Sequence, residues 1–214
     1  MAATSLPDQS STDDEDSGGG TSIANADSAV PDPSPEASTA GDTDDAGLAD
    51  APEPDASPEP SCTDCPLVVQ YMTPITSATT QEIEPHLQIV NNGTSAQSLN
   101  ALTLRYWYTA DGSTTQAFDC DYALVGCGVV QGMFVAMATP TATADHYMEV
   151  SFTGGSVMAG SNSGEIQTRF HDASYAVTFT QTNDYSFNAS DTSYTQWNQV
   201  TLYRNGALVW GVEP

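Results

Sequence analysis

The sequence of 214 residues predicts an all-β sandwich over residues 67–214, preceded by a disordered acidic linker over residues 1–66. In the C-terminal part, apolar and polar residues alternate with a period of two in several short windows, as half-buried strands do. Turn residues bound each window, and no convincing amphipathic helix lies between them. Short strands at this spacing indicate an antiparallel sandwich or barrel.

The predicted strands can be followed in order along the chain. Alternation is clearest at 67–72, 85–90, 102–108, 147–152 and 200–203. Gly, Asn and Asp mark the turns, at Asn91-Asn92-Gly93, Asp111-Gly112, Gly154-Gly155, Gly160-Ser161-Asn162 and Asn205-Gly206. The last of these is the strongest local signal, because Asn-Gly between two apolar runs favours a type I′ hairpin turn.

The linker is predicted from its composition. Residues 1–66 hold 16 of the 28 acidic residues, most of the prolines, and neither Lys nor Arg. Such a segment buries too little apolar surface to offset its ordering entropy. Its Pro-Glu pieces and its like charges favour an extended chain.

The charge of residues 67–214 argues against two classes of partner, although an acidic excess can also simply keep a protein soluble in a salty environment. This part has 12 acidic residues against three arginines and no lysine. A nucleic-acid partner needs a basic patch, and so does an anionic membrane surface. An uncharged polysaccharide remains compatible. No hydrophobic run is long enough to span a bilayer, and no signal peptide is visible in the first residues.

The four cysteines form two close pairs, Cys62 with Cys65 and Cys120 with Cys127. An even count with local pairing favours two disulfides in an oxidising compartment. A zinc site with four thiolate ligands is the alternative, although the second pair is widely spaced for a zinc knuckle. A redox role for Cys62 is disfavoured because no βαβ pattern surrounds it.

The sequence favours binding over catalysis. Its three histidines show no metal-ligand spacing, and no Gly-x-Ser-x-Gly motif is present. Carboxylate pairs such as Asp119 and Asp121 lie two residues apart on a predicted strand, so both side chains point the same way. A glycosidase needs two carboxylates opposed across a cleft.

Four segments, in the same order, resemble the family-3 carbohydrate-binding modules, the cellulose-binding β-sandwiches of bacterial cellulases and cellulosome scaffolds. They are Leu102-Thr103-Leu104-Arg105-Tyr106-Trp107-Tyr108-Thr109-Ala110-Asp111-Gly112, Phe152-Thr153-Gly154-Gly155, Thr180-Gln181-Thr182-Asn183-Asp184-Tyr185-Ser186-Phe187, and the closing hairpin at 199–214. The resemblance covers about 148 residues and implies a nine-stranded antiparallel jelly-roll β-sandwich.

The resemblance also implies a flat strip that binds crystalline cellulose. Coplanar aromatic rings cover the faces of the sugar rings, and polar groups bond their edges. The strip's positions fall on Asp121, Tyr122, Arg169 and Tyr175, with Gln167 and Gln81 as polar partners. Tyr175 stands where many members have tryptophan. The segment after Tyr122 is short and adds no further tyrosine, as in the short-loop subgroup of free cellulases.

A structural calcium ion is implied in the same way. Its ligands fall on two loops, at Thr109, Asp111, Thr180, Asn183 and Asp184. Oxygen donors of these kinds suit calcium, although each loop alone is ordinary turn chemistry. A second cluster resembles the family's shallow groove on the opposite sheet: Arg105, Trp107, Tyr147, Glu149, Tyr185 and Tyr203.

We therefore expect a non-catalytic, extracellular module that binds cellulose or a related insoluble β-glucan and targets a linked glycoside hydrolase to it. Chitin stays open as the polymer. One alternative is a strip-impaired interaction or sensor module that packs against a catalytic domain or binds single glycan chains. Another is an acidic structural protein of the cell surface, which would bind no glycan.

Overall fold

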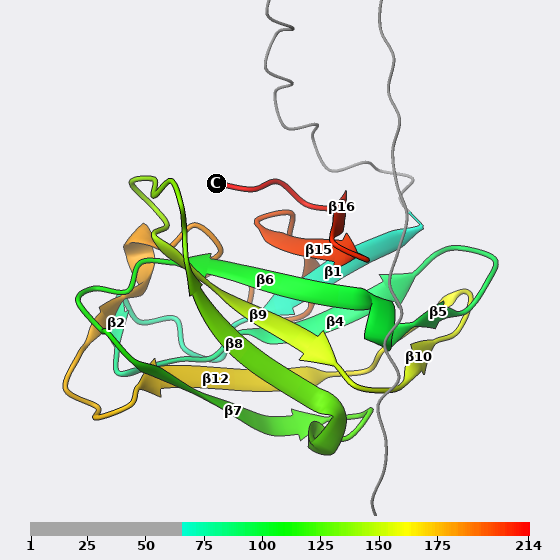
Figure 1. Ribbon diagram of the computed structural model, residues 1–214, viewed down its shortest axis with the longest axis horizontal. Coiled ribbons are helices and arrows are strands. Elements are labelled where there is room, and N and C mark those ends of the chain that lie inside the picture. The colour runs from blue at the N-terminus through cyan, green and yellow to red at the C-terminus, as the bar shows by residue number, and fades with distance from the viewer. Residues whose placement is uncertain (1–65) are drawn as a thin grey trace, which may run out of the picture. The chain divides into compact units, whose positions relative to one another are not determined.

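The computed structural model describes residues 66–214, which form two antiparallel sheets packed face to face (Figure 1). The predictions for residues 1–65, including the linker and the Cys62–Cys65 pair, lie outside the described residues. In the described part, nine strands have four residues or more: β1 (Leu67–Met72), β4 (His86–Asn91), β6 (Leu102–Tyr108), β7 (Gln116–Ala123), β8 (Val130–Ala136), β9 (His146–Phe152), β12 (Ile166–Asp172), β15 (Val200–Arg204) and β16 (Ala207–Trp210). The all-β sandwich is confirmed.

Shorter elements complete the described part of the chain. Two-residue strands are β2 (Thr79–Thr80), β3 (Glu82–Ile83), β5 (Gln97–Ser98), β10 (Ser156–Val157), β11 (Ser161–Asn162), β13 (Phe179–Thr180) and β14 (Thr195–Gln196). Three single-turn 3-10 helices are η1 (Leu99–Ala101), η2 (Cys127–Val129) and η3 (Gln181–Asn183). No helix between residues 66 and 214 is long and apolar enough to cross a membrane.

One sheet follows the order β14-β1-β4-β12-β3, with β7 paired to β12 and β11 paired to β4. The sheet that packs against it follows the order β16-β15-β6-β9-β8, and β10-β5 and β13-β2 form two further two-stranded sheets. Alternate residues of both sheets point into one core, in which Tyr71, Leu87, Tyr106 and Phe170 are almost fully buried. The opposite face of the seven-stranded sheet carries polar residues of the same strands, as the period of two predicts. The opposite face of the other sheet carries a second, smaller hydrophobic cluster around Trp107 and Tyr203.

The hairpin between β15 and β16 forms where the sequence predicts it. Asn205 and Gly206 both have positive φ, 52° and 82°, and Arg204 pairs with Ala207 across them. Two central residues in this region define the type I′ turn, which Asn-Gly tolerates better than other pairs. This prediction is confirmed.

A β-bulge interrupts the pairing of β7 with β12. Gln167 pairs with Tyr122, but its neighbour Thr168 pairs with Cys120, so Asp121 has no partner residue. An extra residue in one strand locally shifts the alternation of its side chains. Two successive residues, Asp121 and Tyr122, are consequently both exposed, while Ala123 returns to the core.

Candidate binding face

The predicted strip residues lie together on the outer face of the seven-stranded sheet. Gln167 and Arg169 alternate with the buried residues of β12 and therefore point outward. His171 follows on the same face but is buried, since the ring of Tyr175 stacks on it. β7 places Tyr122 opposite Gln167 and Asp119 opposite Arg169. Residues two apart along a strand are separated by about 7 Å. The strip thus runs along the strands rather than across them.

Arg169 is the central charge of the strip. Its Nε donates to Asp121 Oδ1 at 2.9 Å, and its other two nitrogens lie 3.5 Å from Asp119 Oδ2 and 3.3 Å from Glu82 Oε1. The hydrogen bond to Asp121 and the surrounding carboxylates raise the pKa of Arg169 above its ordinary value. Three carboxylates hold the planar guanidinium in one orientation. Exposed ion pairs of this kind add little stability, so orientation is their main effect.

Tyr175 forms one end of the strip. The residue is 42% exposed, and its ring stacks on the imidazole of His171. The side-chain amide of Gln81 donates to the main-chain oxygen of Tyr175 at 3.0 Å. Gln81 is therefore brought to this end of the strip, as predicted, but its amide nitrogen is engaged by the turn that carries Tyr175.

Tyr122 forms the other end, with 47% of its surface exposed. Next to it, Gln167 donates to Glu165 Oε2 at 2.7 Å. An open hollow of about 610 Å³ adjoins both residues. Its lining residues are Gln88, Tyr122, Leu124, Gly164, Glu165 and Gln167.

A disulfide closes the short segment beyond Tyr122. Cys120 and Cys127 are bonded, with their Cα atoms 5.6 Å apart, which confirms this predicted pair. A zinc site with four thiolate ligands is excluded, because these two sulfurs are bonded to each other. The bridge joins β7 to η2 directly beside the bulge, so it restrains the segment that presents Asp121 and Tyr122.

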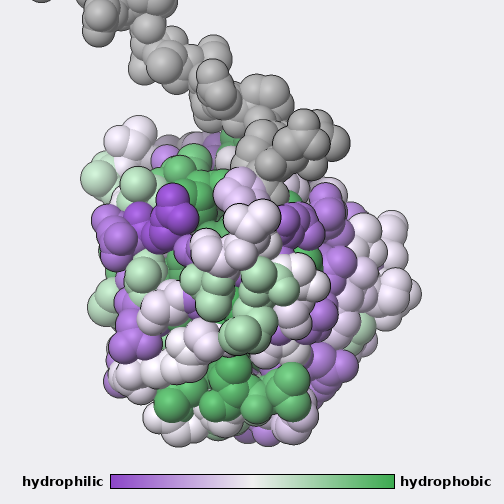
Figure 2. Space-filling model, turned by 90° about the vertical axis from the view of Figure 1, so that its right-hand side faces the viewer, coloured by the Kyte–Doolittle hydropathy of each residue, from purple (hydrophilic) through white to green (hydrophobic). Residues whose placement is uncertain are grey.

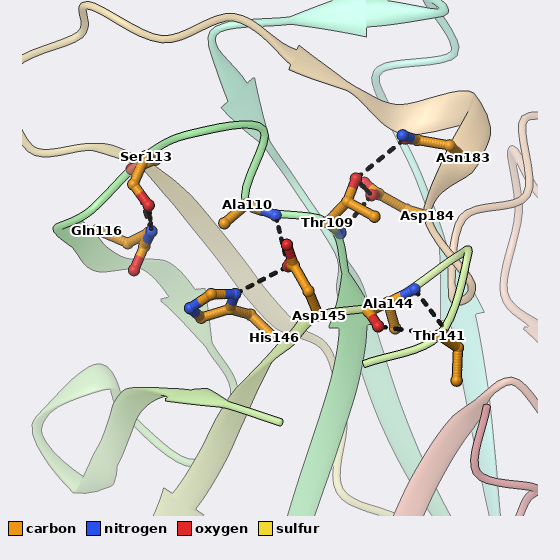
Figure 3. Close-up of polar contacts among 10 residues, drawn as sticks. All are labelled: Thr109, Ala110, Ser113, Gln116, Thr141, Ala144, Asp145, His146, Asn183 and Asp184. Carbon is orange, nitrogen blue, oxygen red and sulfur yellow. Dashed lines mark hydrogen bonds and ion pairs between the residues drawn. The ribbon is translucent and has the colours of Figure 1, made fainter. Parts of the chain in front are cut away.

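The two predicted calcium loops also come together (Figure 3). Asp184 Oδ1 accepts hydrogen bonds from the main-chain nitrogen of Thr109 at 2.8 Å and from its hydroxyl at 2.9 Å. The same hydroxyl lies 3.1 Å from Asn183 Oδ1. Asp111 Oδ2 accepts from the main-chain nitrogen of Thr180 at 2.6 Å.

The donor set fits a hard cation. Asp184 Oδ2 is buried and has no hydrogen-bond partner within residues 66–214. Burial raises the pKa of Asp184 to about 8, and the nearby carboxylates of Asp111 and Asp145 act in the same direction. No group of three or more Asp, Glu, His or Cys side chains among the described residues is placed to hold a metal by itself. Hydroxyl, amide and main-chain oxygens would have to complete the coordination, as they commonly do for calcium.

The second cluster gathers on the opposite sheet, as predicted. The guanidinium of Arg105 lies 4.4 Å from the ring centroid of Tyr147 and 4.1 Å from that of Tyr203. Its Nε donates to Glu149 Oε2 at 2.8 Å. Trp107 packs against Tyr147 and is almost fully buried. The side chains are thus largely engaged with one another.

The sequence profile of the cellulose binding domain family matches residues 68–211. The chain belongs to this family. It is therefore a non-catalytic carbohydrate-binding module, and its fold agrees with solved structures of the family. A family-3a module with flanking linkers from a Clostridium thermocellum scaffoldin is 41% identical, with a TM-score of 0.66, over 72% of this chain and 94% of that one.

Curated relatives place similar domains in larger proteins. Cellulosomal-scaffolding protein B of Acetivibrio thermocellus is 44% identical over 69% of this chain, and a xyloglucanase of a Paenibacillus species is 42% identical over 65%. The alignments cover only 20% and 14% of those two proteins. A biomass-sensing module of Clostridium thermocellum also shares the fold, with 29% identity and a TM-score of 0.66 over 71% of this chain.

Three contributors to the binding face escaped the sequence predictions. Glu82 and Asp119 both contact Arg169, and His171 supports Tyr175. Two of them could have been found from the sequence, because Asp119 lies two residues from Asp121 and His171 lies two residues from Arg169, a spacing that places strand residues on the same face. Glu82 could not, because it reaches Arg169 only through the pairing of β3 with β12.

Proposed function

We propose that the domain binds crystalline cellulose, or a related insoluble β-glucan, through the strip of Asp121, Tyr122, Arg169 and Tyr175, with Gln167 and Gln81 beside it. The observation that carries this proposal is the arrangement of two exposed tyrosines at either end of a guanidinium held by three carboxylates. Membership of the cellulose binding domain family supports the choice of polymer.

The chemistry of the strip suits the face of a glucan chain. Each pyranose ring presents axial C–H groups above its plane and hydroxyls at its edges. Tyr122 and Tyr175 offer apolar ring surface at a low cost in side-chain entropy, because both backbones are fixed in a strand or a turn. Arg169 and Asp121 form a planar polar pair that donates and accepts hydrogen bonds between the two rings.

Calcium has a supporting place in this proposal. The ion would bind Thr109, Asp111, Thr180, Asn183 and Asp184, with the unpartnered Asp184 Oδ2 as one donor. It would neutralise a buried carboxylate and join the loop after β6 to η3. Its role would be structural, because the ion would link these two loops and its ligands include no side chain of the strip.

The relatives suggest a setting for the domain. Similar domains occur in a cellulosomal scaffolding protein and in an exoglucanase and an endoglucanase. We infer an extracellular module that concentrates a linked or associated glycoside hydrolase on its insoluble substrate. Because the substrate is a surface rather than a soluble molecule, the gain comes from raising the local concentration of the enzyme.

A second function, that of a sensor module, is favoured by one finding. Solved biomass-sensing modules share this fold at about the same TM-score as the scaffoldin modules. A sensor would bind the same class of polymer but would report binding to another part of its protein.

Adsorption of the full chain to microcrystalline cellulose tests the proposed function. The parent should bind, while Tyr122→Ala and Tyr175→Ala should each be released. Met133→Ala is the matched control, because it removes an equally exposed side chain from the opposite sheet. Failure of the folded parent to bind any insoluble glucan would refute the proposal, and equal binding by all variants would refute the strip.

A further inference from the structure

An exposed leucine lies in line with the strip, just beyond Tyr122. After Tyr122 the chain alternates normally, because the next residue points into the core and Leu124 is 66% exposed. Tyr122 pairs with Gln167, and the main-chain nitrogen of Leu124 donates to the oxygen of Glu165 at 3.0 Å. Tyr122 and Leu124 also line the same hollow. Leu124 therefore lies on the outer face of the sheet, on the side of Tyr122 away from Arg169.

The main chain holds Leu124 in this place. Besides its bond to the segment before β12, the turn that contains Leu124 is closed by a hydrogen bond from the main-chain nitrogen of Gly126 to the oxygen of Ala123 at 2.8 Å. The disulfide between Cys120 and Cys127 spans the same turn. Restraints of this kind reduce the ordering that a ligand must impose when it binds. The exposed side chain of Leu124 is thus presented by an ordered segment.

The side chain of Leu124 rests on the main chain of Gly164. A Cβ atom at Gly164 would lie 2.3 Å from the side chain of Leu124, so any other residue at this position would displace it. Gly164 also has a φ of +71°, which other residues seldom adopt. One side of the leucine is therefore fixed against the backbone, and its other side is open to solvent.

Leu124 extends an apolar surface that begins at Tyr122. Large apolar side chains that are exposed singly are common, whereas contiguous ones mark binding surfaces. Tyr122 and Leu124 are both exposed, and both line one hollow. Figure 2 shows hydrophobic surface gathered at the lower edge, where Figure 1 places the end of β7 and η2. Apolar surface therefore continues past Tyr122.

The position of Leu124 lengthens the row of side chains that can face one glucan chain. From the level of His171, on which Tyr175 stacks, to the level of Gln167, β12 spans four residues, or roughly 14 Å. Leu124 lies at the level of Glu165, two residues farther, so the row becomes roughly 20 Å long. Each further pyranose ring of the chain presents another apolar face. A longer row therefore covers more of the same chain.

We propose that Leu124 packs against the apolar face of the sugar that follows the one on Tyr122, along the same glucan chain. This inference rests on the proposed function and deepens it, because it names a residue that sets how many consecutive sugars of one chain the strip covers. Leu124 contributes apolar surface only. The hydrogen bonds to the edges of the sugar rings come from other side chains of the strip.

Adsorption isotherms of the full chain on microcrystalline cellulose test this role of Leu124. Leu124→Ala removes most of the exposed apolar surface, and Leu124→Gln keeps the length of the side chain but makes its end polar. Both should weaken adsorption roughly three- to ten-fold, as expected for the loss of a partly buried leucine contact. Leu124→Met preserves an apolar side chain and should bind within about two-fold of the parent. Met133→Ala, which changes an exposed apolar residue of the opposite sheet, is the matched control and should bind as the parent does.

The outcomes separate this inference from the proposed function. A folded parent that fails to adsorb overturns both. If the parent adsorbs and Tyr122→Ala is released, parental binding by Leu124→Ala and Leu124→Gln overturns the role of Leu124 alone. Equal losses in Leu124→Gln and Leu124→Met also overturn it, because any substitution would then act through the turn. Where Leu124→Ala lowers the melting temperature, the comparison of Leu124→Gln with Leu124→Met decides, measured at a temperature at which both are folded.

Discussion

The ring of Tyr175 stacks on the imidazole of His171, with centroids 3.9 Å apart and planes inclined by 12°. Tyr175 has a φ of 56°, a left-handed conformation that bulky residues seldom adopt. The turn is held by the main-chain nitrogen of Tyr175, which donates to the oxygen of Asp172 at 2.8 Å. The exposed ring of Tyr175 is thus held in place by its left-handed backbone and by the imidazole of His171 on which it stacks.

This stack predicts that His171 contributes to cellulose binding without touching the glucan. In His171→Ala the Tyr175 ring loses its support, which for an aromatic pair corresponds to about 0.5–1.5 kcal/mol. We expect adsorption to microcrystalline cellulose to weaken roughly two- to ten-fold. His171→Phe should retain most of the binding, because it preserves a flat partner. Parental binding by His171→Ala, alongside loss in Tyr175→Ala, would show that the stack is dispensable.

The hydrogen bonds of the Asp172 carboxylate predict that the turn carrying Tyr175 loses stability in acid. Hydrogen bonds from the hydroxyls of Ser174 and Ser113, and then from the main chain of Ala176, lower the pKa of Asp172 from 3.8 to about 2. A lowered pKa in the folded state stabilises the fold above pH 3.8, and this contribution is lost as the pH falls through about 2. The free energy of unfolding should therefore fall in this acid window.

Urea unfolding of the parent and of Asp172→Asn between pH 7 and pH 2 checks this. The variant should be less stable at neutral pH, and the difference should shrink as the pH falls from about 4 to about 2. A difference in stability that is the same at every pH would contradict the assignment, because Asp172 would then not be the titrating group.

The close contact between Phe118 and Gly132 predicts that position 132 does not tolerate a side chain. A Cβ atom at Gly132 would lie 2.1 Å from the ring of Phe118, which joins β8 to the strand that carries Asp121. Overpacking of this kind costs about 1–3 kcal/mol. We expect Gly132→Ala to lower the melting temperature clearly. Gly128→Ala is the control, because nothing lies within 4 Å of its Cβ position. Equal melting temperatures for the two variants would mean that β7 can move away from the new methyl group without loss of stability.

The proposed calcium ion predicts a melting temperature that depends on the metal. A ligand present at 100 times its dissociation constant stabilises a fold by about 2.7 kcal/mol. Chelation should therefore lower the melting temperature of the parent, and added Ca²⁺ should restore it. Asp184→Asn should respond to neither. Asp191→Asn removes a buried carboxylate elsewhere and should behave as the parent does. Metal analysis of undialysed protein that finds no calcium would contradict the site.

Much of the fold could be predicted because five of its nine longer strands carry a local alternation signal, whereas β7, β8 and β12 were not among the predicted windows. The alternation at 67–72 and 102–108 gives the bounds of β1 and β6 without error. Asn205-Gly206 gives the last hairpin, since few other pairs tolerate two positive φ angles. The two-residue strands could not be predicted, because two residues show no period. β3, for example, exists only through its pairing with β12.

The binding face was predicted as a set of residues but not as an arrangement. Resemblance to a family located Arg169 and Asp121, yet the contacts of Arg169 with Glu82 and Asp119 depend on strand pairing. The stacking of Tyr175 on His171 depends on a left-handed backbone that the residue types do not suggest. The register that places Gln70 opposite both Gln88 and Gln196 is likewise not specified by any local pattern.

Because Asp121 is the extra residue of the bulge in β7, its carboxylate can be removed from the binding face without changing the pairing of the other residues of the strand. Removal of Asp121 would leave Cys120 facing the core and Tyr122 facing outward, as an uninterrupted ladder requires. A single-codon deletion can therefore take away one of the three acidic partners of Arg169 without turning any other side chain over. Along this strand, the charge of the surface and the packing of the interior can evolve independently.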